Sequence, residues 1–333
     1  MDQVVLISRA GRDSLTPDTI AAVEGHAELV VHRRQAAPEP DEAAELLRRA
    51  TVLASTNICL PRLDRRLLDA CPRLRAVVLY ATGHEHVDRS LLASRGIDLR
   101  TLPGYATVAV AEHALGLVLG QATRLTLAND RARGAVDAGV SLRGVELAGR
   151  TLGVVGVGRI GSRLGVIASG IGMRVVGADP DPEARRHAAA LGIAPVDHAE
   201  LYARSSVVAL CAATTRGAPP VVGEPELRSM RPGSFLVNVG RPALVDTRAA
   251  VAALRSGHLR GYAVDDVVAG AADADVVAEG RLVQTAHSAW WRDEVLVRGA
   301  DAFGETVLDT LRAATAPDDP APVREPATAE VAG

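Results

Sequence analysis

The segment TLGVVGVGRIG (151–161) decides the fold, because its glycines stand where an apolar strand gives way to a helix. Gly156, Gly158 and Gly161 form a G-x-G-x-x-G pattern, and a second apolar run ends at Asp179, 18 residues after the last glycine. The first glycine permits a tight turn, the second lets the backbone approach a pyrophosphate, and the third lets helix and strand pack closely. The pattern predicts a dinucleotide-binding βαβ unit.

The same segment predicts NAD as the cofactor. The N–H groups of Arg159 and Ile160, at the start of the helix, and the positive end of the helix dipole favour phosphate oxygens. Asp179 would accept hydrogen bonds from both ribose hydroxyls and would repel a 2′-phosphate. Arg185 and Arg186 could bind such a phosphate, but their spacing from Asp179 places them on the following helix. We therefore expect NAD rather than NADP.

Composition bounds the class of protein. The 333 residues suffice for two domains, and 48% hydrophobic with 23% charged residues is typical of a globular chain. The net charge of −3 gives no basic field for nucleic acid or for an anionic membrane. All 37 basic residues are arginine, which excludes a Schiff-base lysine mechanism. The three cysteines form neither a disulfide framework nor a C-x-x-C pair, so we expect no metal site.

Neither a secretory signal nor an apolar run long enough for a membrane span is evident, and we expect a cytoplasmic protein. Outward from the glycine-rich segment, short apolar runs alternate with helical patterns, which is typical of parallel sheets covered on both faces. The predicted strands are 4–8, 28–32, 50–55, 74–80, 151–156, 174–179, 205–211, 234–239, 261–266 and 281–286. Between the two series lie a long helix after Pro103-Gly104 and a polar, glycine-containing stretch at 130–148 that suggests an exposed arm.

Over about residues 50–310 the chain resembles the NAD-dependent D-2-hydroxyacid dehydrogenases, which include glycerate, phosphoglycerate and formate dehydrogenases. The order and spacing of the matching segments are much more specific than any one segment. The segments are ATGHEHVD, LPGYATVAVAEHALGL, GVVGVGRIG, MRPGSFLVNVGRPALVD, ALRSGHLRGYAVDDV and TAHSAW. The resemblance implies an α/β protein of two Rossmann-like domains, one flavodoxin-like and one dinucleotide-binding, with a cleft between them.

The resemblance implies two catalytic residues. Arg241 matches the family's arginine in an N-x-x-R turn, and a guanidinium fork can bind the carboxylate and the ketone oxygen of a 2-oxo acid together. His287 in TAHSAW matches the family's histidine, which donates a proton to the oxygen during reduction and accepts it during oxidation. One departure is Pro242, where the family usually has glycine; proline disfavours the α conformation of Arg241.

A second departure concerns the glutamate that usually orients this histidine. An ungapped alignment from Arg241 puts Gly270 at its position. Formate dehydrogenase also departs here, so hydride transfer is compatible with the loss. The acids that could substitute are Asp266, Asp273, Asp275 and Glu279, and the sequence does not choose among them.

The resemblance also implies binding residues. The loop Ala81-Thr82-Gly83 would hold the substrate carboxylate through backbone N–H groups, with the adjacent His84 and His86 either reading a second anionic group or simply exposed. Trp290 would form an apolar wall over the substrate or pack between domains. Asp265 would hold the nicotinamide carboxamide. The other implied cofactor contacts are Thr107, Cys211 and Val239.

The domains implied are a substrate-binding domain (1–102), an NAD-binding domain (103–287), a helix returning to the first domain (288–314) and a disordered tail (315–333). The function implied is NAD-dependent reduction of a small 2-oxo acid to a D-2-hydroxy acid, and the reverse, by a homodimer. Two alternatives stay open. One is an NAD(H)-sensing regulatory protein on the same scaffold, and the other is a formate-type dehydrogenase with no proton to transfer.

Overall fold

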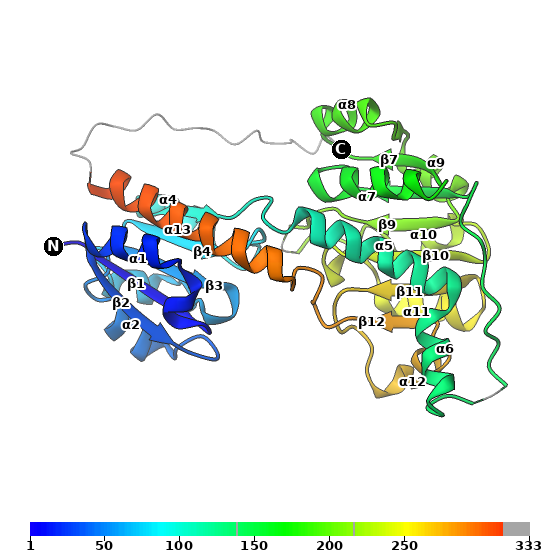
Figure 1. Ribbon diagram of the computed structural model, residues 1–333, viewed down its shortest axis with the longest axis horizontal. Coiled ribbons are helices and arrows are strands. Elements are labelled where there is room, and N and C mark those ends of the chain that lie inside the picture. Colours follow the sequence, from blue (N-terminus) through cyan, green and yellow to red (C-terminus); the bar gives the residue numbers. More distant parts are fainter. Residues whose placement is uncertain (138, 216, 316–333) are drawn as a thin grey trace. The chain divides into compact units, whose positions relative to one another are not determined.

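The computed structural model describes residues 1–137, 139–215 and 217–315, which Figure 1 colours from blue to red along the chain. This part of the chain forms two compact units. The first unit comprises Met1–Tyr105 with the C-terminal helix that begins at Asp293, and the second comprises Ala106–Arg292. The tail predicted at 315–333 lies outside the described residues from residue 316 onward.

A five-stranded parallel sheet forms the centre of the first unit. Its strands are β1 (Gln3–Ser8), β2 (Glu28–Arg33), β3 (Val52–Thr56), β4 (Ala76–Tyr80) and β5 (Asp98–Thr101). They lie in the order β2-β1-β3-β4-β5, which is the flavodoxin-like order. Every residue of β1 is buried, as expected for a continuous apolar run in a sheet covered on both faces.

Helices cover both faces of this sheet. Apolar side chains of α1 (Pro17–Glu24) and α13 (Asp293–Thr315) pack with one face of the strands. Side chains of α2 (Pro40–Leu47), α3 (Arg65–Ala70) and α4 (Arg89–Ser94) pack with the other. A Cβ on Gly304 of α13 would lie 2.4 Å from Thr19 Oγ1, so a glycine is required where α13 meets α1.

The second unit contains a seven-stranded parallel sheet. Its strands are β6 (Thr151–Val155), β7 (Arg174–Ala178), β8 (Ala194–Pro195), β9 (Val207–Leu210), β10 (Ser234–Asn238), β11 (Leu259–Val264) and β12 (Leu282–Gln284). The order β12-β11-β10-β9-β6-β7-β8 reverses direction between β6 and β9. This is the doubly wound order of dinucleotide-binding sheets, extended by one strand, and ligands bind at such a reversal.

Two sets of helices sandwich the second sheet. On one face α5 (Thr107–Thr123) lies against α7 (Arg159–Gly170), and Figure 1 shows the two side by side. Helices α9 (His198–Arg204), α10 (Glu224–Ser229), α11 (Thr247–Arg255) and α12 (Ala274–Ala278) contribute to the core on the opposite face. The remaining helices are α6 (Leu125–Ala132) and α8 (Pro182–Ala190), with four short 3-10 turns at Gly11–Ser14, Asn57–Cys59, Pro242–Leu244 and Ala271–Asp273.

Local signals place the helix ends. Thr16 caps α1 by accepting a hydrogen bond from the N–H of Thr19, with Pro17 in the first turn. The long helix ends where Arg124 adopts a left-handed conformation at φ 60°, and α6 starts directly after it. The polar stretch that follows α6 contains no helix or strand in its described residues; the N–H of Val145 donates to the carbonyl of Ala122 and ties this stretch to the end of α5.

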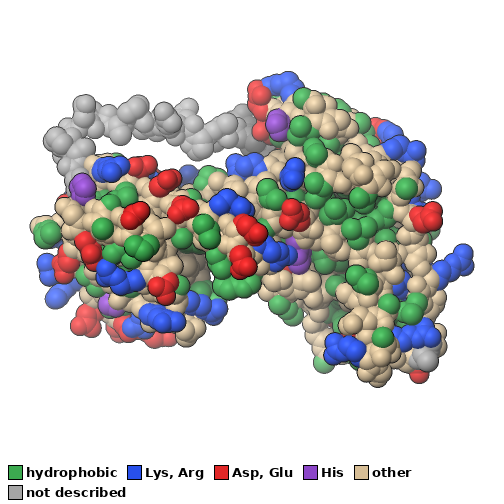
Figure 2. Space-filling view, viewed as in Figure 1, with side chains coloured by type: hydrophobic (Ala, Val, Ile, Leu, Met, Phe, Trp, Pro, Cys, Tyr) green, Lys and Arg blue, Asp and Glu red, His purple; other side chains and the backbone are tan. Residues whose placement is uncertain are grey.

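The surface carries charges of both signs. Figure 2 shows arginine and acidic side chains interspersed over the visible face, in keeping with the net charge of −3. Among the described residues, no helix is long and apolar enough to cross a membrane.

Candidate active site

Seven predicted site residues of the second unit follow strands at one edge of its sheet. In a parallel sheet all strands end at the same edge, so the residues that follow successive strands become neighbours. Backbone hydrogen bonds connect the strand ends in series: Val239 N to Leu210 O, Asp265 N to Asn238 O, and Thr285 N to Val264 O. The residues at this edge are Gly156, Asp179, Cys211, Val239, Arg241, Asp265 and His287.

The glycine-rich turn after β6 has the geometry that a pyrophosphate requires. Gly156 has φ 85°, which favours glycine, and a Cβ there would lie 2.6 Å from the backbone N of Ala212. A Cβ on Gly161 would lie 2.0 Å from the carbonyl oxygen of Gly156, so the helix reaches the strand only with glycine at this position. By contrast, a Cβ on Gly158 would meet nothing within 4 Å. The turn is thus closed on its protein side and open at Gly158, where a phosphate would approach.

Asp179 follows β7 directly and faces this turn. Its Oδ2 accepts the N–H of Val157 at 2.9 Å, and its Oδ1 accepts the N–H of Asp181 at 2.9 Å. Each carboxylate oxygen keeps a second acceptor site, which is what two ribose hydroxyls need. Arg185 lies on α8, and its guanidinium donates to the carbonyls of Asp179 and Pro180 at 2.6 and 3.0 Å.

The remaining predicted cofactor contacts lie on several elements of the second unit. Arg159 and Ile160 open α7, and Thr107 is the first residue of α5. Cys211 follows β9, and its N–H donates to Val155 O at 2.8 Å. Burial raises the pKa of the Cys211 thiol to about 12, which disfavours its thiolate form. Val239 is buried after β10.

Arg241 is carried by a turn that Asn238 holds in place. The side-chain amide of the buried Asn238 accepts the N–H of Gly240 at 3.0 Å and donates to the carbonyl of Arg241 at 2.8 Å. Arg241 has φ −132° and ψ 146°, the extended conformation that a following proline favours. The guanidinium Nη1 donates to the carbonyl of Gly240 at 3.1 Å. The Arg241-Pro242 departure is therefore accommodated without distortion of the turn.

Asp265 organises the loop that carries His287. Its Oδ1 accepts the hydroxyl of Thr285 at 2.7 Å and the N–H of Ser288 at 2.8 Å, and its Oδ2 accepts the N–H of Ala289 at 3.0 Å. These bonds enclose Ala286 and His287, which have φ values of 48° and 58°. Left-handed backbone is unfavourable for residues other than glycine, so the surrounding bonds offset this cost. In the structure both carboxylate oxygens of Asp265, the residue predicted to hold the nicotinamide carboxamide, accept hydrogen bonds from this loop.

His287 has an acidic neighbour. Its Nδ1 lies 3.3 Å from Oδ2 of Asp266, the residue next to Asp265. The His287 side chain is 53% exposed and that of Asp266 31% exposed, so the imidazole is accessible for a bound substrate while one nitrogen faces a carboxylate.

Behind the loop, His113 of α5 bridges two of its residues. His113 Nε2 lies 3.0 Å from Thr285 Oγ1, and Arg292 donates to His113 Nδ1 at 3.2 Å. Because an arginine only donates, Nδ1 must be an acceptor, and the proton of a neutral His113 is on Nε2. Burial lowers the pKa of His113, with Arg292 acting in the same direction and Asp265 opposing it. Sequence reasoning missed His113 and Arg292, because nothing in a single sequence connects His113 with a loop more than 170 residues away.

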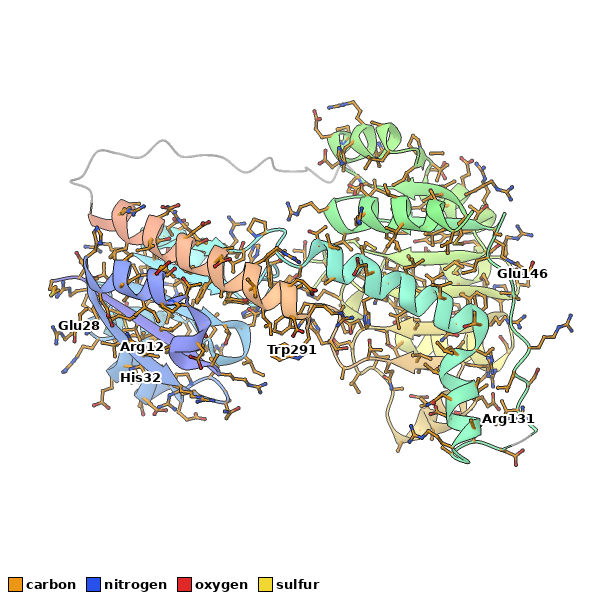
Figure 3. The ribbon with its side chains drawn as sticks, viewed as in Figure 1. Arg12, Glu28, His32, Arg131, Glu146 and Trp291 are labelled. Carbon is orange, nitrogen blue, oxygen red and sulfur yellow. The ribbon has the colours of Figure 1, made fainter. Side chains whose placement is uncertain are left out.

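Trp290 and Trp291 follow the His287 loop in the sequence. Trp290 is partly buried, Trp291 is 59% exposed, and their rings meet edge to face with centroids 4.9 Å apart. Figure 3 labels Trp291 just before α13.

In the first unit, the predicted substrate loop follows β4. The carbonyl of Ala81 accepts the N–H of Leu102 at 2.9 Å, and the hydroxyl of Thr82 donates to the carbonyl of Leu102, also at 2.9 Å. These two hydrogen bonds hold Ala81 and Thr82, the residues between β4 and Gly83, against Leu102. His84 Nδ1 lies 3.4 Å from the carbonyl of Thr82 and the ring is partly exposed.

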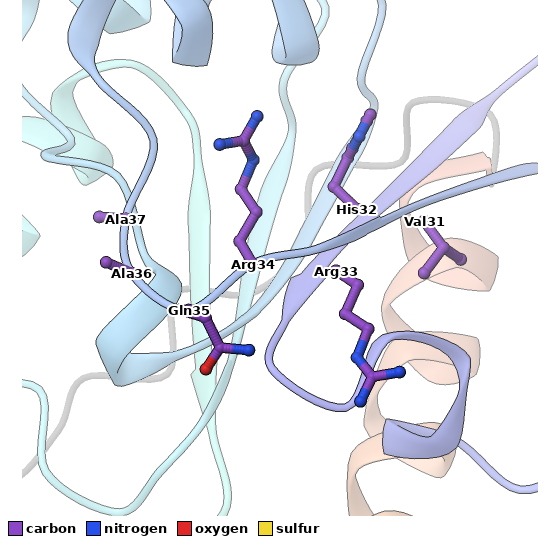
Figure 4. Close-up of a pocket in the computed structure, with 7 residues that line it drawn as sticks. All are labelled: Val31, His32, Arg33, Arg34, Gln35, Ala36 and Ala37. Carbon is purple, nitrogen blue, oxygen red and sulfur yellow. The ribbon is translucent and has the colours of Figure 1, made fainter.

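A separate hollow in the first unit contains none of the predicted site residues. Figure 4 shows this hollow, about 520 Å³ in volume and lined by the consecutive residues 31–37 at the end of β2. Within it, Arg34 forms an ion pair with Glu42 and Arg33 Nε donates to the carbonyl of Arg9 at 3.0 Å. Its arginines are thus engaged by the protein. Among the described residues, no group of three His, Cys, Asp or Glu is placed to hold a metal ion.

The two glycines of the turn should respond differently to alanine. Gly161→Ala places a Cβ against a backbone carbonyl and should lower stability by about 1–3 kcal/mol, because backbone atoms cannot move aside easily. Gly158→Ala should leave the melting temperature unchanged and weaken NADH binding about tenfold or more. Thermal melting of each variant checks the stability, and fluorescence titration with NADH checks the affinity. Equal NADH affinity in Gly158→Ala and the unmodified protein would contradict the proposed phosphate approach.

Neutral His113 should make the loop sensitive to acid. A lowered histidine pKa means that its stabilising contribution is present above about pH 6.5 and declines as pH falls below that value. Hydrogen exchange of the Ser288 and Ala289 amides, corrected for intrinsic rates, should therefore show less protection at about pH 5 than at about pH 8. His113→Gln removes the titrating group and should flatten this trend. Protection independent of pH in the unmodified protein would contradict the assignment.

Comparisons with known proteins agree with this geometry. The family model described as the NAD-binding domain of D-isomer specific 2-hydroxyacid dehydrogenases matches residues 115–289. A glyoxylate reductase from Thermococcus litoralis is 31% identical over 255 residues, which cover 74% of this chain and 76% of that protein. The residues matched by the family model include both the glycine-rich turn and His287.

Solved structures share the whole architecture. A protein from Thermus thermophilus has a TM-score of 0.78 at 30% identity, covering 93% of this chain and 97% of its own. A D-lactate dehydrogenase from Aquifex aeolicus, solved with NAD and lactic acid, shares the fold with a TM-score of 0.73 at 23% identity, covering 93% of this chain and 94% of its own. The expected fold and family are confirmed: the chain belongs to the D-isomer specific 2-hydroxyacid dehydrogenases, with NAD as its cofactor.

Proposed function

We propose that this enzyme reduces a small 2-oxo acid to its D-2-hydroxy acid with Arg241 binding the substrate and His287 transferring the proton. The observation that carries this proposal is the position of the two residues. Arg241 follows β10 and His287 follows β12, so they flank β11 at the sheet edge where the NAD-binding turn also lies. Relatives named glyoxylate reductase and D-3-phosphoglycerate dehydrogenase act on acids of this class, which supports the substrate class.

Arg241 would hold the substrate by its acidic end. A planar guanidinium presents N–H groups that can bind a carboxylate oxygen and the neighbouring ketone oxygen at once. Its turn is pinned by Asn238 and by the extended backbone before Pro242. Because the turn is fixed, the fork is oriented before substrate arrives, which lowers the entropic cost of binding. We also propose that backbone N–H groups of the Ala81-Thr82-Gly83 loop bind the substrate carboxylate, as the resemblance to the family implies.

His287 would supply the proton. Bound NADH supplies the hydride that adds to C2 of the substrate. As the C–H bond forms, negative charge grows on the former ketone oxygen. The imidazolium of His287 donates the Nε2 proton to this oxygen and becomes neutral, while Arg241 stabilises the developing charge. In the reverse direction, neutral His287 accepts the proton of the hydroxyl group.

The alternatives fit less well. A formate-type reaction has no proton to transfer to an oxygen, yet His287 is exposed on a loop that several hydrogen bonds hold in left-handed backbone. A purely NAD(H)-sensing protein would not require such a loop either. We further propose a cytoplasmic homodimer, for which the exposed Leu119 on α5 and Leu125 on α6 offer apolar contact surface.

Cofactor preference should follow from Asp179. In the unmodified enzyme the 2′-phosphate of NADPH would face this carboxylate, and we expect the Kd of NADPH to exceed that of NADH by about 10- to 100-fold. Asp179→Ser should narrow this ratio. Asp275→Ser is the control, because Asp275 pairs with Arg255 at the far end of α11. If the unmodified enzyme bound NADPH more tightly than NADH, the proposal that Asp179 selects NADH would be wrong.

Loss of the guanidinium should remove activity but not cofactor binding. Arg241→Ala should lower kcat/KM for every 2-oxo acid by about 10³-fold, because both substrate binding and charge stabilisation are lost. Arg241→Lys should recover little, since the fork is absent. Arg248→Ala, which changes an arginine on the first turn of α11, is the matched control and should behave as the unmodified enzyme. Near-normal kcat/KM in Arg241→Ala would overturn the proposed role.

A further inference from the structure

The acidic partner expected for the catalytic histidine is absent from its usual position. Gly270 stands there, in an exposed part of the chain, and a Cβ at Gly270 would meet nothing within 4 Å. Four acids nearby could take over the role, and the structure distinguishes between them. They are Asp266, Asp273, Asp275 and Glu279.

Three of these acids are engaged by arginines elsewhere. Arg255, at the end of α11, lies 3.3 Å from Asp273 and 2.8 Å from Asp275. The hydrogen bond from Arg255 lowers the pKa of Asp275 to about 2. Glu279 forms an ion pair with Arg281. All three are thus paired with an arginine, and Asp273 and Asp275 share the same one.

Asp266 is the acid that faces the histidine. Its Oδ1 accepts the backbone N–H of Val267 at 2.8 Å, which fixes the carboxylate, and its Oδ2 lies 3.3 Å from His287 Nδ1. The preceding Asp265 binds the backbone of the same loop, at Ser288 and Ala289. The two consecutive carboxylates therefore have different roles. Asp265 holds the backbone of the loop, and Asp266 contacts the imidazole ring of His287.

We propose that Asp266 is the positioning residue for His287 and replaces the glutamate absent at residue 270. This inference rests on the proposed function of His287. A carboxylate accepts a hydrogen bond and cannot donate one when ionised, so Nδ1 carries a proton in both states of the ring. Nε2 is then the nitrogen that faces the substrate oxygen.

The resulting proton transfer is balanced. During reduction the Nε2–H bond breaks and the substrate O–H bond forms, so the imidazolium becomes a neutral ring that still donates from Nδ1 to Asp266. During oxidation the bare Nε2 accepts the hydroxyl proton. Asp266 remains ionised throughout, and it acts on the tautomer and orientation of the ring without exchanging a proton.

The test compares Asp266→Ala with Asp273→Ala. Both remove a partly exposed carboxylate from the segment after β11, but only the first faces His287. General acid–base catalysis contributes about 10²- to 10⁴-fold, and we expect Asp266→Ala to lose part of it, lowering kcat about 10- to 100-fold. KM for the 2-oxo acid should stay within about threefold, because Arg241 still binds the substrate. Asp273→Ala should retain kcat.

A spectroscopic measurement tests the same proposal without turnover. In protein labelled with ¹⁵N-histidine and saturated with NAD⁺, at a pH where His287 is neutral, the ring shifts should report a proton on Nδ1. His287→Gln assigns the signals. In Asp266→Ala the proton should move to Nε2, the tautomer that free imidazole side chains favour in water, while Asp273→Ala should leave Nδ1 protonated.

The outcomes separate this inference from the function beneath it. An unchanged tautomer and unchanged kcat in Asp266→Ala overturn the role of Asp266 and leave the function of His287 standing. Full activity in His287→Gln instead overturns the proposed function itself. A lower kcat with an unchanged tautomer in Asp266→Ala also counts against the inference, because the effect would then be structural.

Discussion

All strands of the NAD-binding unit run parallel, and this constraint brings the candidate residues that follow its strands to one edge of the sheet. Parallel strands end at one edge, so the segments that follow β6, β7, β9, β10, β11 and β12 form a continuous row there. Gly156, Asp179, Arg241 and His287 are distant in sequence and share nothing except following a strand. The chemistry is thereby confined to loops, while the apolar strands between them supply a rigid frame.

The loop that follows β12, residues 285–292, contains the most strained backbone of the site. His287 sits in left-handed backbone, which ordinary residues adopt at a cost of about 1–3 kcal/mol. Hydrogen bonds to the buried Asp265 and the bridge through His113 over-determine this conformation. Backbone strain that is supported in this way is common where a side chain must be held in one orientation. Here the hydrogen bonds of the buried Asp265 carboxylate support the backbone of His287, whose imidazole is exposed.

Sequence alone predicts much of this arrangement. The β-branched apolar runs predict every strand of the described residues except β5 and β8. The glycine spacing predicts the turn before α7. The strand β5 escapes prediction because its sequence, DLRT, carries two charges and becomes a strand only by pairing with β4. The strand β8 has two residues and is likewise formed by its neighbour. Tertiary pairing overrides local preference at both sheet edges.

Within the site, a motif predicts which residue types are present but not which side chains meet. The sequence leaves four acids as partners of His287, and only the fold brings Asp266 to it while arginines engage the other three. The motif names Asn238 but does not show that its amide bonds the carbonyl of Arg241. The contact between His113 and Arg292 cannot be predicted from a linear sequence, because it depends on loop geometry. Pattern therefore predicts the reaction class, and three-dimensional contacts identify the supporting residues.

The most direct test is a steady-state assay of NADH oxidation with a panel of small 2-oxo acids, followed by chiral analysis of the product. The account predicts that at least one such acid is reduced with NADH, that a chiral product has the D configuration, and that His287→Gln abolishes the reaction. Oxidation of formate with no reduction of any 2-oxo acid, or formation of the L product, would contradict it.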